Sequence, residues 1–342
     1  MSERMGLGIV GAGAIARAYA AAIEKGSSAR LVAVADVDRG AAEAMATAAG
    51  AAAFRSHADL ADSGLCDAVV ITTPPVTHAP IAIDLASWGL PILCEKPLSV
   101  DLESAIRMTR AATENGVLLS MASKFRFVED VIRAREMIDS GAIGRPLVLE
   151  NTFTSVVDMS ARWNSDPKVS GGGVLIDNGT HSVDIVRYMF GQITEVLAVS
   201  GPRIQEMTVE DSVTLMARTQ DGKQATIETS WSLHKDRPYF IGIYGTDGAI
   251  EVGWKSSRVR RGRNGAWERF GTGYDKVTAF ERQIDCFVGV LKGENRALPD
   301  AHDALASVLV IQAAYRSMAR RAWTPVDERP VPTEVPRAGK AL

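Results

Sequence analysis

The sequence has few cysteines and no long apolar run. Its three cysteines, Cys66, Cys94 and Cys286, are an odd number without metal-ligand spacing, which argues against a disulfide framework and indicates a reducing compartment. No apolar run approaches the length of a membrane-spanning helix. The strand expected at residues 6–10 also leaves no room before it for the apolar region of a signal peptide. We therefore expect a cytoplasmic protein without a membrane partner.

An excess of charge of one sign is also missing. The chain has 38 Lys and Arg against 41 Asp and Glu, and its formal net charge is -3. Nucleic-acid binding requires a broad basic face, so we expect no nucleic-acid partner. The basic residues are scattered apart from one small cluster, which we interpret as a solvent-exposed hairpin: Arg258, Arg260, Arg261 and Arg263.

The first third of the chain contains a regular alternation of short apolar strands and helices. Six such repeats predict a doubly wound parallel sheet in an α/β fold. With 342 residues, of which 46% are hydrophobic, the chain is long enough for two domains with substantial cores. We place the first domain at residues 1–122 and the second at residues 123–342.

A glycine-rich turn follows the first predicted strand. Residues 7–10 read as a buried strand, Gly11-Ala12-Gly13-Ala14-Ile15-Ala16 follows, and an alanine-rich helix then runs to about Lys25. In a dinucleotide-binding turn, Gly11 permits the tight bend, Gly13 lets the backbone approach a pyrophosphate, and Ala16 allows close packing of helix on strand. The order of strand, turn and helix therefore predicts a Rossmann domain that binds NAD or NADP.

Asp36 ends the second predicted strand. An acidic residue at this point binds the adenosine ribose hydroxyls and repels a 2′-phosphate, so the sequence favours NAD. NADP stays an alternative cofactor because Arg39 lies nearby in the sequence, and an arginine at such sites binds the additional phosphate.

Two further strand ends carry polar residues toward the expected cofactor. The strand at residues 68–71 is followed by Thr72, Thr73, Pro74 and, four residues later, His78. The prolines exclude helix there and hold the backbone beside the cofactor, where Thr72, Thr73 and His78 offer polar contacts.

The strand at residues 92–94 delivers Glu95 and Lys96 and then stops at Pro97. The proline biases Lys96 toward an extended backbone, which keeps the lysine at the carboxyl edge of the sheet. Close to an oxidised nicotinamide ring the ammonium form is disfavoured, so Lys96 could accept a proton. The alternative is an ordinary surface salt bridge.

From residue 145 onward the pattern changes to longer alternating strands, with Asp221-Gly222 and Asp247-Gly248 as hairpin turns. These predict a large, mostly antiparallel sheet. Helices are expected at 127–140, from about 173, at 278–291 and at 303–320. The expected strands are 146–157, 194–202, 212–219, 224–233, 239–244 and 249–252.

The densest polar cluster of the second half follows three glycines, at residues 170–184. Asp177 and His181 are four residues apart, so on a helix they share one face and can act on one bound molecule. The glycines leave room for a ligand or for a close-packed neighbour. The alternative is a buried histidine satisfied by Asp177; the strand end at Lys96 in a dinucleotide fold favours the catalytic interpretation.

Taken together, these motifs resemble the Gfo/Idh/MocA family, which is named after glucose-fructose oxidoreductase, inositol dehydrogenase and a rhizopine-catabolism protein. The resemblance extends over nearly the full length. It depends on GAGAIA, TTPPVTH, CEKPLS, the segment Lys124-Phe125-Arg126-Phe127, and GGGVLIDNGTHSVDI. It implies an N-terminal Rossmann domain and a C-terminal domain whose open sheet often mediates formation of homodimers or homotetramers.

The resemblance also implies that Lys96, Asp177 and His181 are catalytic. His181 or Lys96 accepts the hydroxyl proton, and we favour His181, with Lys96 as its orienting partner. The substrate pocket is expected to include Lys124, Arg126, Arg162, Trp163, Asn178 and His181. The expected cofactor contacts are Gly11, Gly13, Ala14, Ile15, Asp36, Thr72, Thr73, Pro74, His78, Glu95 and Lys96.

The sequence thus predicts an NAD-dependent oxidoreductase that acts on a secondary hydroxyl of a sugar, inositol or related polyol. Many substrate hydroxyls require many polar partners, which suits a pocket rich in polar groups. Three alternatives remain: an NADP-dependent reductase of keto sugars or diols, a glycosidase that uses tightly held NAD, and a non-catalytic regulator that binds a dinucleotide.

Overall fold

The computed structural model describes residues 4–294 and 296–327, and the chain divides into two compact units. Among the described residues, the first unit comprises 4–124 and 276–305, and the second comprises 125–275 and 306–327. The predicted boundary lay at residues 122 and 123. The structure differs from that division because a late segment of the chain, residues 276–305, packs with the first unit.

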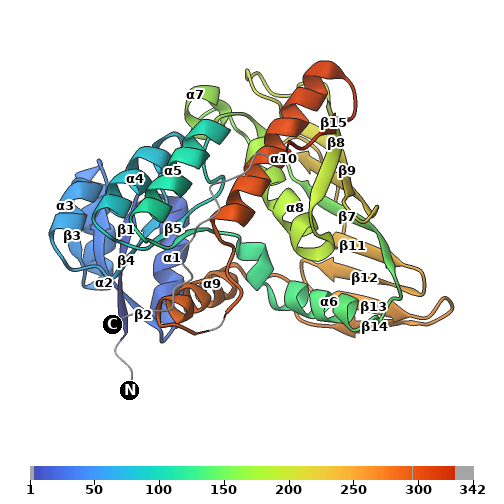
Figure 1. Cartoon of the computed structure of the whole chain (residues 1–342), viewed down its shortest axis with the longest axis horizontal. Helices are drawn as coiled ribbons and strands as arrows, with labels where there is room; N and C mark the ends of the chain where they lie inside the picture. The colour runs from blue at the N-terminus through green and yellow to red at the C-terminus, as the bar shows by residue number, and fades with distance from the viewer. Residues whose placement is uncertain (1–3, 295, 328–342) are drawn as a thin grey trace. The chain divides into compact units, whose positions relative to one another are not determined.

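The first unit contains a six-stranded parallel sheet in the order β3-β2-β1-β4-β5-β6, with helices packed on it, as Figure 1 shows in blue and cyan. The predicted doubly wound sheet is thereby confirmed. Its strands are β1 (Met5–Val10), β2 (Ala29–Ala35), β3 (Ala52–Phe54), β4 (Ala68–Ile71), β5 (Ile92–Cys94) and β6 (Leu119–Met121). Its helices are α1 (Ala14–Lys25), α2 (Arg39–Ala49), α3 (His57–Asp62), η1 (Pro75–Thr77), α4 (His78–Ser87), α5 (Leu102–Glu114) and α9 (Lys276–Leu291).

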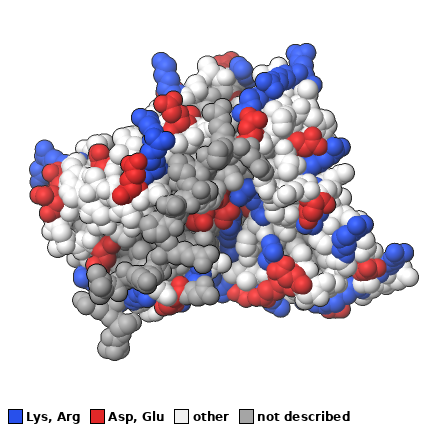
Figure 2. Space-filling view, in the orientation of Figure 1, with Lys and Arg blue, Asp and Glu red and all other residues white. Residues whose placement is uncertain are grey.

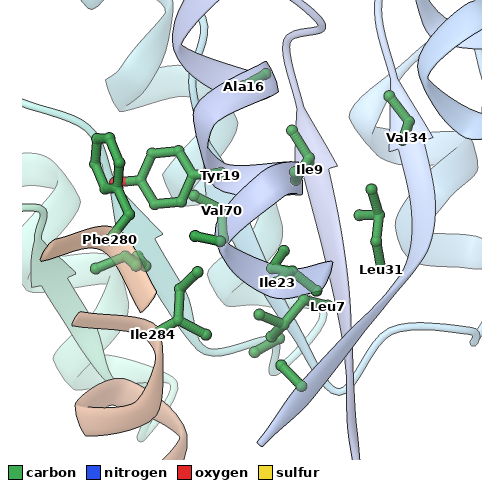
Figure 3. Close-up of a cluster of buried hydrophobic side chains, with 14 of the residues drawn as sticks. Leu7, Ile9, Ala16, Tyr19, Ile23, Leu31, Val34, Val70, Phe280 and Ile284 are labelled. Carbon is green, nitrogen blue, oxygen red and sulfur yellow. The ribbon is translucent and has the colours of Figure 1, made fainter. Parts of the chain in front are cut away.

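Apolar side chains fill both faces of this sheet. All residues of β4 and β5 are fully buried, which explains why their sequences read as continuous apolar runs without alternation. On one face, Phe280 and Ile284 of α9 pack against Tyr19 and Ile23 of α1 (Figure 3). This contact holds a segment more than 250 residues distant in sequence in the core of the first unit.

The second unit is built on a nine-stranded sheet in the order β14-β13-β12-β11-β7-β10-β9-β8-β15. Every neighbouring pair is antiparallel except β7 and β10, which confirms the mostly antiparallel prediction. The strands are β7 (Pro146–Thr154), β8 (Ile193–Ser200), β9 (Ser212–Thr219), β10 (Gln224–Ser230), β11 (Tyr239–Gly245), β12 (Gly248–Gly253), β13 (Ser257–Arg261), β14 (Trp267–Phe270) and β15 (Thr324–Pro325). The helices are η2 (Lys124–Phe127), α6 (Glu129–Asp139), η3 (Trp163–Ser165), α7 (Pro167–Ser170), α8 (Val174–Phe190) and α10 (Ala301–Arg320), and η2 and α10 each cross the unit boundary.

The basic cluster lies in this sheet. Arg258, Arg260 and Arg261 belong to β13, which forms a hairpin with β14, in agreement with the hairpin interpretation. The guanidinium groups of Arg258 and Arg260 lie over the Trp267 ring, at 4.4 and 5.3 Å from its centroid. Within residues 4–294 and 296–327, no helix has the length and apolar character needed to cross a bilayer.

Truncation of the α9 contact tests its place in the first unit. Phe280 is fully buried and its ring centroid lies 4.3 Å from that of Tyr19. We expect Phe280→Ala to lower the free energy of unfolding by ~3–5 kcal/mol, because it leaves a cavity between α1 and α9. Urea denaturation would measure this loss. Val37→Ala, at a side chain that is 96% exposed, serves as the control and should be nearly neutral. A neutral Phe280→Ala would contradict the packing.

Candidate active site

The turn after β1 is shaped by two glycines with different requirements. Gly11 has φ +100°, and a Cβ there would lie 2.8 Å from the backbone nitrogen of Thr73, so the fold itself requires glycine. Gly13 is the N-cap of α1 at φ -76°, and nothing lies within 4 Å of the place where its Cβ would be. Gly13 and Ala14 are exposed and Ile15 is half-buried. The first turn of α1 therefore presents backbone N–H groups to an approaching anion.

Asp36 lies directly after β2 and holds this turn in place. One carboxylate oxygen accepts a hydrogen bond from the Ala12 N–H at 2.6 Å, and the other accepts one from the Asp38 N–H at 2.8 Å. Each oxygen keeps a further lone pair, so the carboxylate can still accept hydrogen bonds from ribose hydroxyls. Arg39, the residue that kept NADP open, pairs with Glu43 on the exposed surface of α2.

The loop after β4 is tied to the glycine turn by Thr72. Its hydroxyl, which is buried, lies 2.7 Å from the Gly11 carbonyl oxygen and 3.0 Å from that of Val10. Its one proton is therefore used within the protein, and Thr72 positions the turn. Thr73 and Pro74 are half-buried at the same edge, where they can meet a ligand.

His78 is fully buried and its ring contacts the protein backbone. Its Nε2 lies 2.8 Å from the Thr73 carbonyl oxygen, and its Nδ1 lies 3.0 Å from that of Pro97. Burial lowers the pKa of His78 and so favours the neutral ring, which has one N–H and can donate to only one of these two carbonyl oxygens. Both ring nitrogens face backbone carbonyl oxygens, one in the loop after β4 and one in the loop after β5, so the imidazole is engaged within the protein, and a contact from His78 to a dinucleotide stays a prediction.

Lys96 stands where predicted, half-buried directly beyond the end of β5, and its peptide bond to Pro97 is cis. Glu95 is 6% exposed and turns inward, because its Oε1 accepts a hydrogen bond from the Tyr19 hydroxyl at 2.9 Å. Its Oε2 accepts one from the Lys96 N–H at 3.0 Å. The carboxylate thus holds the strand end, and a further contact from Glu95 to the cofactor stays a prediction.

In the second unit, α8 carries Asp177 and His181 on one face, as their spacing predicted. Asp177 is half-buried in the first turn, and His181 is 7% exposed. The His181 ring meets Phe125 edge to face at 5.0 Å between centroids, and Phe125 in turn stacks on Tyr274 at 5.3 Å. Aromatic packing of this kind restricts the orientation of the imidazole.

The glycines before α8 make room for a protein neighbour. A Cβ on Gly173 would lie 2.1 Å from the Glu210 carbonyl oxygen, and one on Gly172 would lie 2.0 Å from the Tyr315 hydroxyl oxygen. The Glu210 carboxylate accepts hydrogen bonds from the N–H groups of Gly173 and Leu175, both at 3.1 Å, and from the Tyr315 hydroxyl at 2.8 Å. It therefore caps the helix N-terminus, where a negative charge is stabilising. No local pattern predicts this role for Glu210, because it lies 37 residues beyond Gly173 along the chain.

Arg126 was predicted to line the substrate pocket, but its guanidinium forms a bidentate ion pair with Asp184 of α8. The contacts are 2.7 to 3.1 Å, and the side chains are only 12% and 3% exposed. Arg126 therefore anchors α8 to the preceding η2 turn. Asp184 was not predicted as its partner, because the two residues lie 58 positions apart in the sequence.

The remaining predicted substrate residues are spread over several elements. Lys124 is half-buried, with its ammonium 5.7 Å from the centroid of the Phe280 ring. Asn178 is half-buried beside Asp177, whereas Arg162 and Trp163 are exposed at η3. Lys96 belongs to the first unit and Asp177 and His181 to the second, so their convergence on one pocket stays a prediction. Among the described residues, no group of three or more His, Cys, Asp or Glu side chains could hold a metal ion.

Comparison with known proteins matches both units. Residues 5–123 match an oxidoreductase family with an NAD-binding Rossmann fold, and residues 131–251 match the GFO/IDH/MocA C-terminal domain. An inositol 2-dehydrogenase from Rhizobium meliloti is 30% identical over 92% of this chain and 97% of that protein. A second, from Rubrobacter xylanophilus, is 29% identical over 97% of this chain and 96% of that protein.

Solved structures show the same architecture. The structure of a putative myo-inositol dehydrogenase from Sinorhizobium meliloti has a TM-score of 0.81 at 28% identity, covering 94% of this chain and 100% of that one. A levoglucosan dehydrogenase in complex with NADH and levoglucosan has a TM-score of 0.89, covering 95% and 100% of the two chains. At 23% identity this second likeness shows the fold alone.

The two turn glycines should respond differently to the same added methyl group. We expect Gly11→Ala to destabilise the protein by ~1–3 kcal/mol, because alanine is strained at φ +100°. Gly13→Ala should change stability by less than about 1 kcal/mol, yet weaken NAD binding on the order of tenfold, because its methyl group occupies open space at the helix N-terminus. Urea denaturation and calorimetric NAD titration would separate the two effects. Full NAD affinity in Gly13→Ala would contradict a pyrophosphate site there.

Proposed function

The chain belongs to the Gfo/Idh/MocA oxidoreductase family, and from this premise we propose that it is an NAD-dependent dehydrogenase of sugars, inositols or related polyols. In this proposal a secondary hydroxyl is oxidised to a ketone, or the ketone is reduced. The observation that carries it is similarity to two inositol 2-dehydrogenases along nearly the whole chain. A levoglucosan dehydrogenase from Pseudarthrobacter phenanthrenivorans, 28% identical over 80% of this chain and 83% of that protein, supports the broader class of sugar substrates.

The proposed site residues have separate roles in cofactor binding, proton transfer and substrate binding. NAD, when bound, supplies the carbon that accepts a hydride. The α1 N-terminus and Asp36 hold the dinucleotide, through backbone N–H groups and through ribose hydroxyls respectively. We assign His181 as the group that accepts the hydroxyl proton, with Asp177 on the same helix face to orient it and Lys96 to position the substrate oxygen. Asn178, Arg162, Trp163 and Lys124 are proposed to contact the substrate.

NAD rather than NADP is supported by the contacts of Asp36. Its carboxylate is fixed by two backbone N–H groups, so it cannot easily move away from a 2′-phosphate, and Arg39 is engaged with Glu43. An NADP-dependent reductase is the second candidate within the enzyme class, because that exposed ion pair holds Arg39 only weakly.

We also propose assembly into a homodimer or homotetramer through the sheet of the second unit. Its strands bear partly exposed apolar side chains, among them Leu147 of β7, Val199 of β8 and Met216 of β9. On the face shown in Figure 2, Lys and Arg are interspersed with Asp and Glu among the described residues, which offers little to a nucleic acid. Cys66, Cys94 and Cys286 are free thiols, consistent with the proposed cytoplasmic location.

A substrate screen tests the proposed activity. Sugars, inositols and sugar nucleotides would be incubated with NAD or NADP while the absorbance of the reduced cofactor is followed. We expect reduction of NAD with at least one polyol. Sugar release without net reduced cofactor would identify a glycosidase instead, and dinucleotide binding without turnover across the panel would identify a regulator.

Two alanine variants test the assigned catalytic residues. We expect Lys96→Ala and His181→Ala each to abolish turnover, while the Kd for NAD stays within severalfold of the wild-type value. Lys25→Ala and His57→Ala, at ion pairs on the surface of the first unit, are the matched controls and should keep full activity. Unchanged turnover in both Lys96→Ala and His181→Ala would contradict the proposed mechanism.

Cofactor preference follows from the charge on Asp36. Asp36→Ala should weaken NAD binding and bring the Kd for NADP closer to the Kd for NAD. Asp36→Asn keeps an oxygen that can accept the Ala12 N–H, so it should narrow the preference with less loss of stability. Titration of both cofactors against each variant measures the ratio of the two Kd values. A ratio equal to that of wild type would show that Asp36 does not face the ribose.

A further inference from the structure

A chain of three buried polar side chains ends at the backbone of Lys96. The Gln283 amide Nε2 donates to the Tyr19 hydroxyl oxygen at 3.0 Å, and that hydroxyl donates to Glu95 Oε1 at 2.9 Å. Glu95 Oε2 accepts the Lys96 N–H at 3.0 Å. Tyr19 and Gln283 are fully buried and Glu95 is 6% exposed, so water does not compete for these contacts.

The direction of each hydrogen bond is fixed by the chemistry of the groups. Burial, together with the neighbouring Glu95 carboxylate, raises the pKa of Tyr19 well above its usual value, so the hydroxyl keeps its proton. That single proton goes to Glu95, and the hydroxyl oxygen is left to accept from Gln283. Each oxygen of Glu95 faces one donor, the Tyr19 hydroxyl or the Lys96 N–H, so the carboxyl group accepts both hydrogen bonds.

The three residues come from three elements of the first unit. Tyr19 lies on α1, the helix whose N-terminus forms the cofactor turn, Gln283 lies on α9, and Glu95 follows β5. Figure 3 shows the Tyr19 ring beside Phe280 of α9, and the two ring centroids are 4.3 Å apart. The chain of hydrogen bonds therefore joins the cofactor helix and a late helix to the strand end that carries Lys96.

We propose that Gln283, Tyr19 and Glu95 are positioning residues that set the direction of the Lys96 side chain by holding its backbone N–H. The inference rests on the proposed function, in which Lys96 takes part in the reaction. A carboxylate costs free energy to bury, and apolar residues at these three positions would fill the same space without that cost. Gln283 Oε1 is in addition buried with no hydrogen-bond partner among the described residues. These polar groups are present despite the free-energy cost of burying them, and they lie beside a residue of the proposed reaction. Their position therefore points to a role in placing Lys96.

A double-mutant cycle between Tyr19 and Glu95 tests the proposal. Tyr19→Phe removes one oxygen, and we expect kcat to fall on the order of tenfold while the Kd for NAD changes less than about twofold. In a Glu95→Gln background, the same change should lower kcat by less than about twofold, because its effect passes through Glu95. If the losses in kcat of the two single variants multiply in the double variant, the proposal is overturned. An unchanged kcat in Tyr19→Phe would also overturn it.

Two controls separate positioning from general destabilisation. Tyr244→Phe, at a half-buried tyrosine of β11, should leave kcat unchanged. The pH profile of kcat should change in Tyr19→Phe and not in Tyr244→Phe, since only the first alters the surroundings of Lys96. A profile identical to wild type in both would contradict the proposal.

The failure of this proposal is distinguishable from that of the proposed function. Lys96→Ala is measured in parallel: if it keeps full turnover, the role of Lys96 and the positioning role both fall while the proposed activity stands, whereas if it is inactive and Tyr19→Phe is not impaired, only the positioning role falls. The proposed function itself fails only if no polyol of the screen reduces the cofactor. Gln283→Met removes the donor to the Tyr19 hydroxyl but keeps the hydrogen bond from Tyr19 to Glu95. It is the alternative test variant if Tyr19→Phe does not fold. We expect it to lower kcat in the same direction by a smaller factor, and an unchanged kcat would overturn the proposal.

Discussion

Parallel hydrogen bonding between β1, β4, β5 and β6 is the constraint on which the candidate site of the first unit depends. The register continues beyond the strands: the Thr72 N–H donates to Val10, that of Glu95 to Ile71, and that of Ala122 to Cys94, at 2.7 to 2.9 Å. Because all these strands run in one direction, their carboxyl ends lie along one edge of the sheet. The glycine turn, the Thr72 loop and Lys96 are neighbours for this reason.

Polar contacts then fix this edge more tightly than strand pairing alone. Asp36 holds the glycine turn, Thr72 ties the next loop to it, and His78 links that loop to the residues after Lys96. Each contact uses a buried or half-buried group whose partner is the backbone, so losing it would leave an unsatisfied polar atom. Several residues that look like ligand contacts in the sequence thus serve to shape the site.

The sequence predicted the features that depend on local pattern. The apolar strands, the glycine turn, Asp36 and the four-residue spacing of Asp177 and His181 are local signals, and the structure places each on its expected element. A hairpin was expected at the basic cluster, but the bounds of its short strands β13 and β14 were not predicted, because charged residues hide their alternation.

Contacts between residues distant in sequence could not be predicted in the same way. Arg126 and Trp163 carry side chains suited to a pocket, and nothing adjacent in sequence shows that Arg126 is paired with Asp184. The same holds for Glu210 at the α8 N-terminus and for Gln283 beside Tyr19, whose roles arise only when separate elements pack together. A single sequence gives periodicity and motif but not these partners.

Isotopic labelling follows the proposed hydride transfer from a polyol carbon to nicotinamide. A polyol that turns over would be supplied with deuterium on the carbon of the reacting hydroxyl, and the reduced cofactor would be analysed by mass spectrometry. We expect the deuterium to appear in the reduced nicotinamide. Deuterium lost to solvent, or converted substrate with no reduced cofactor, would contradict it.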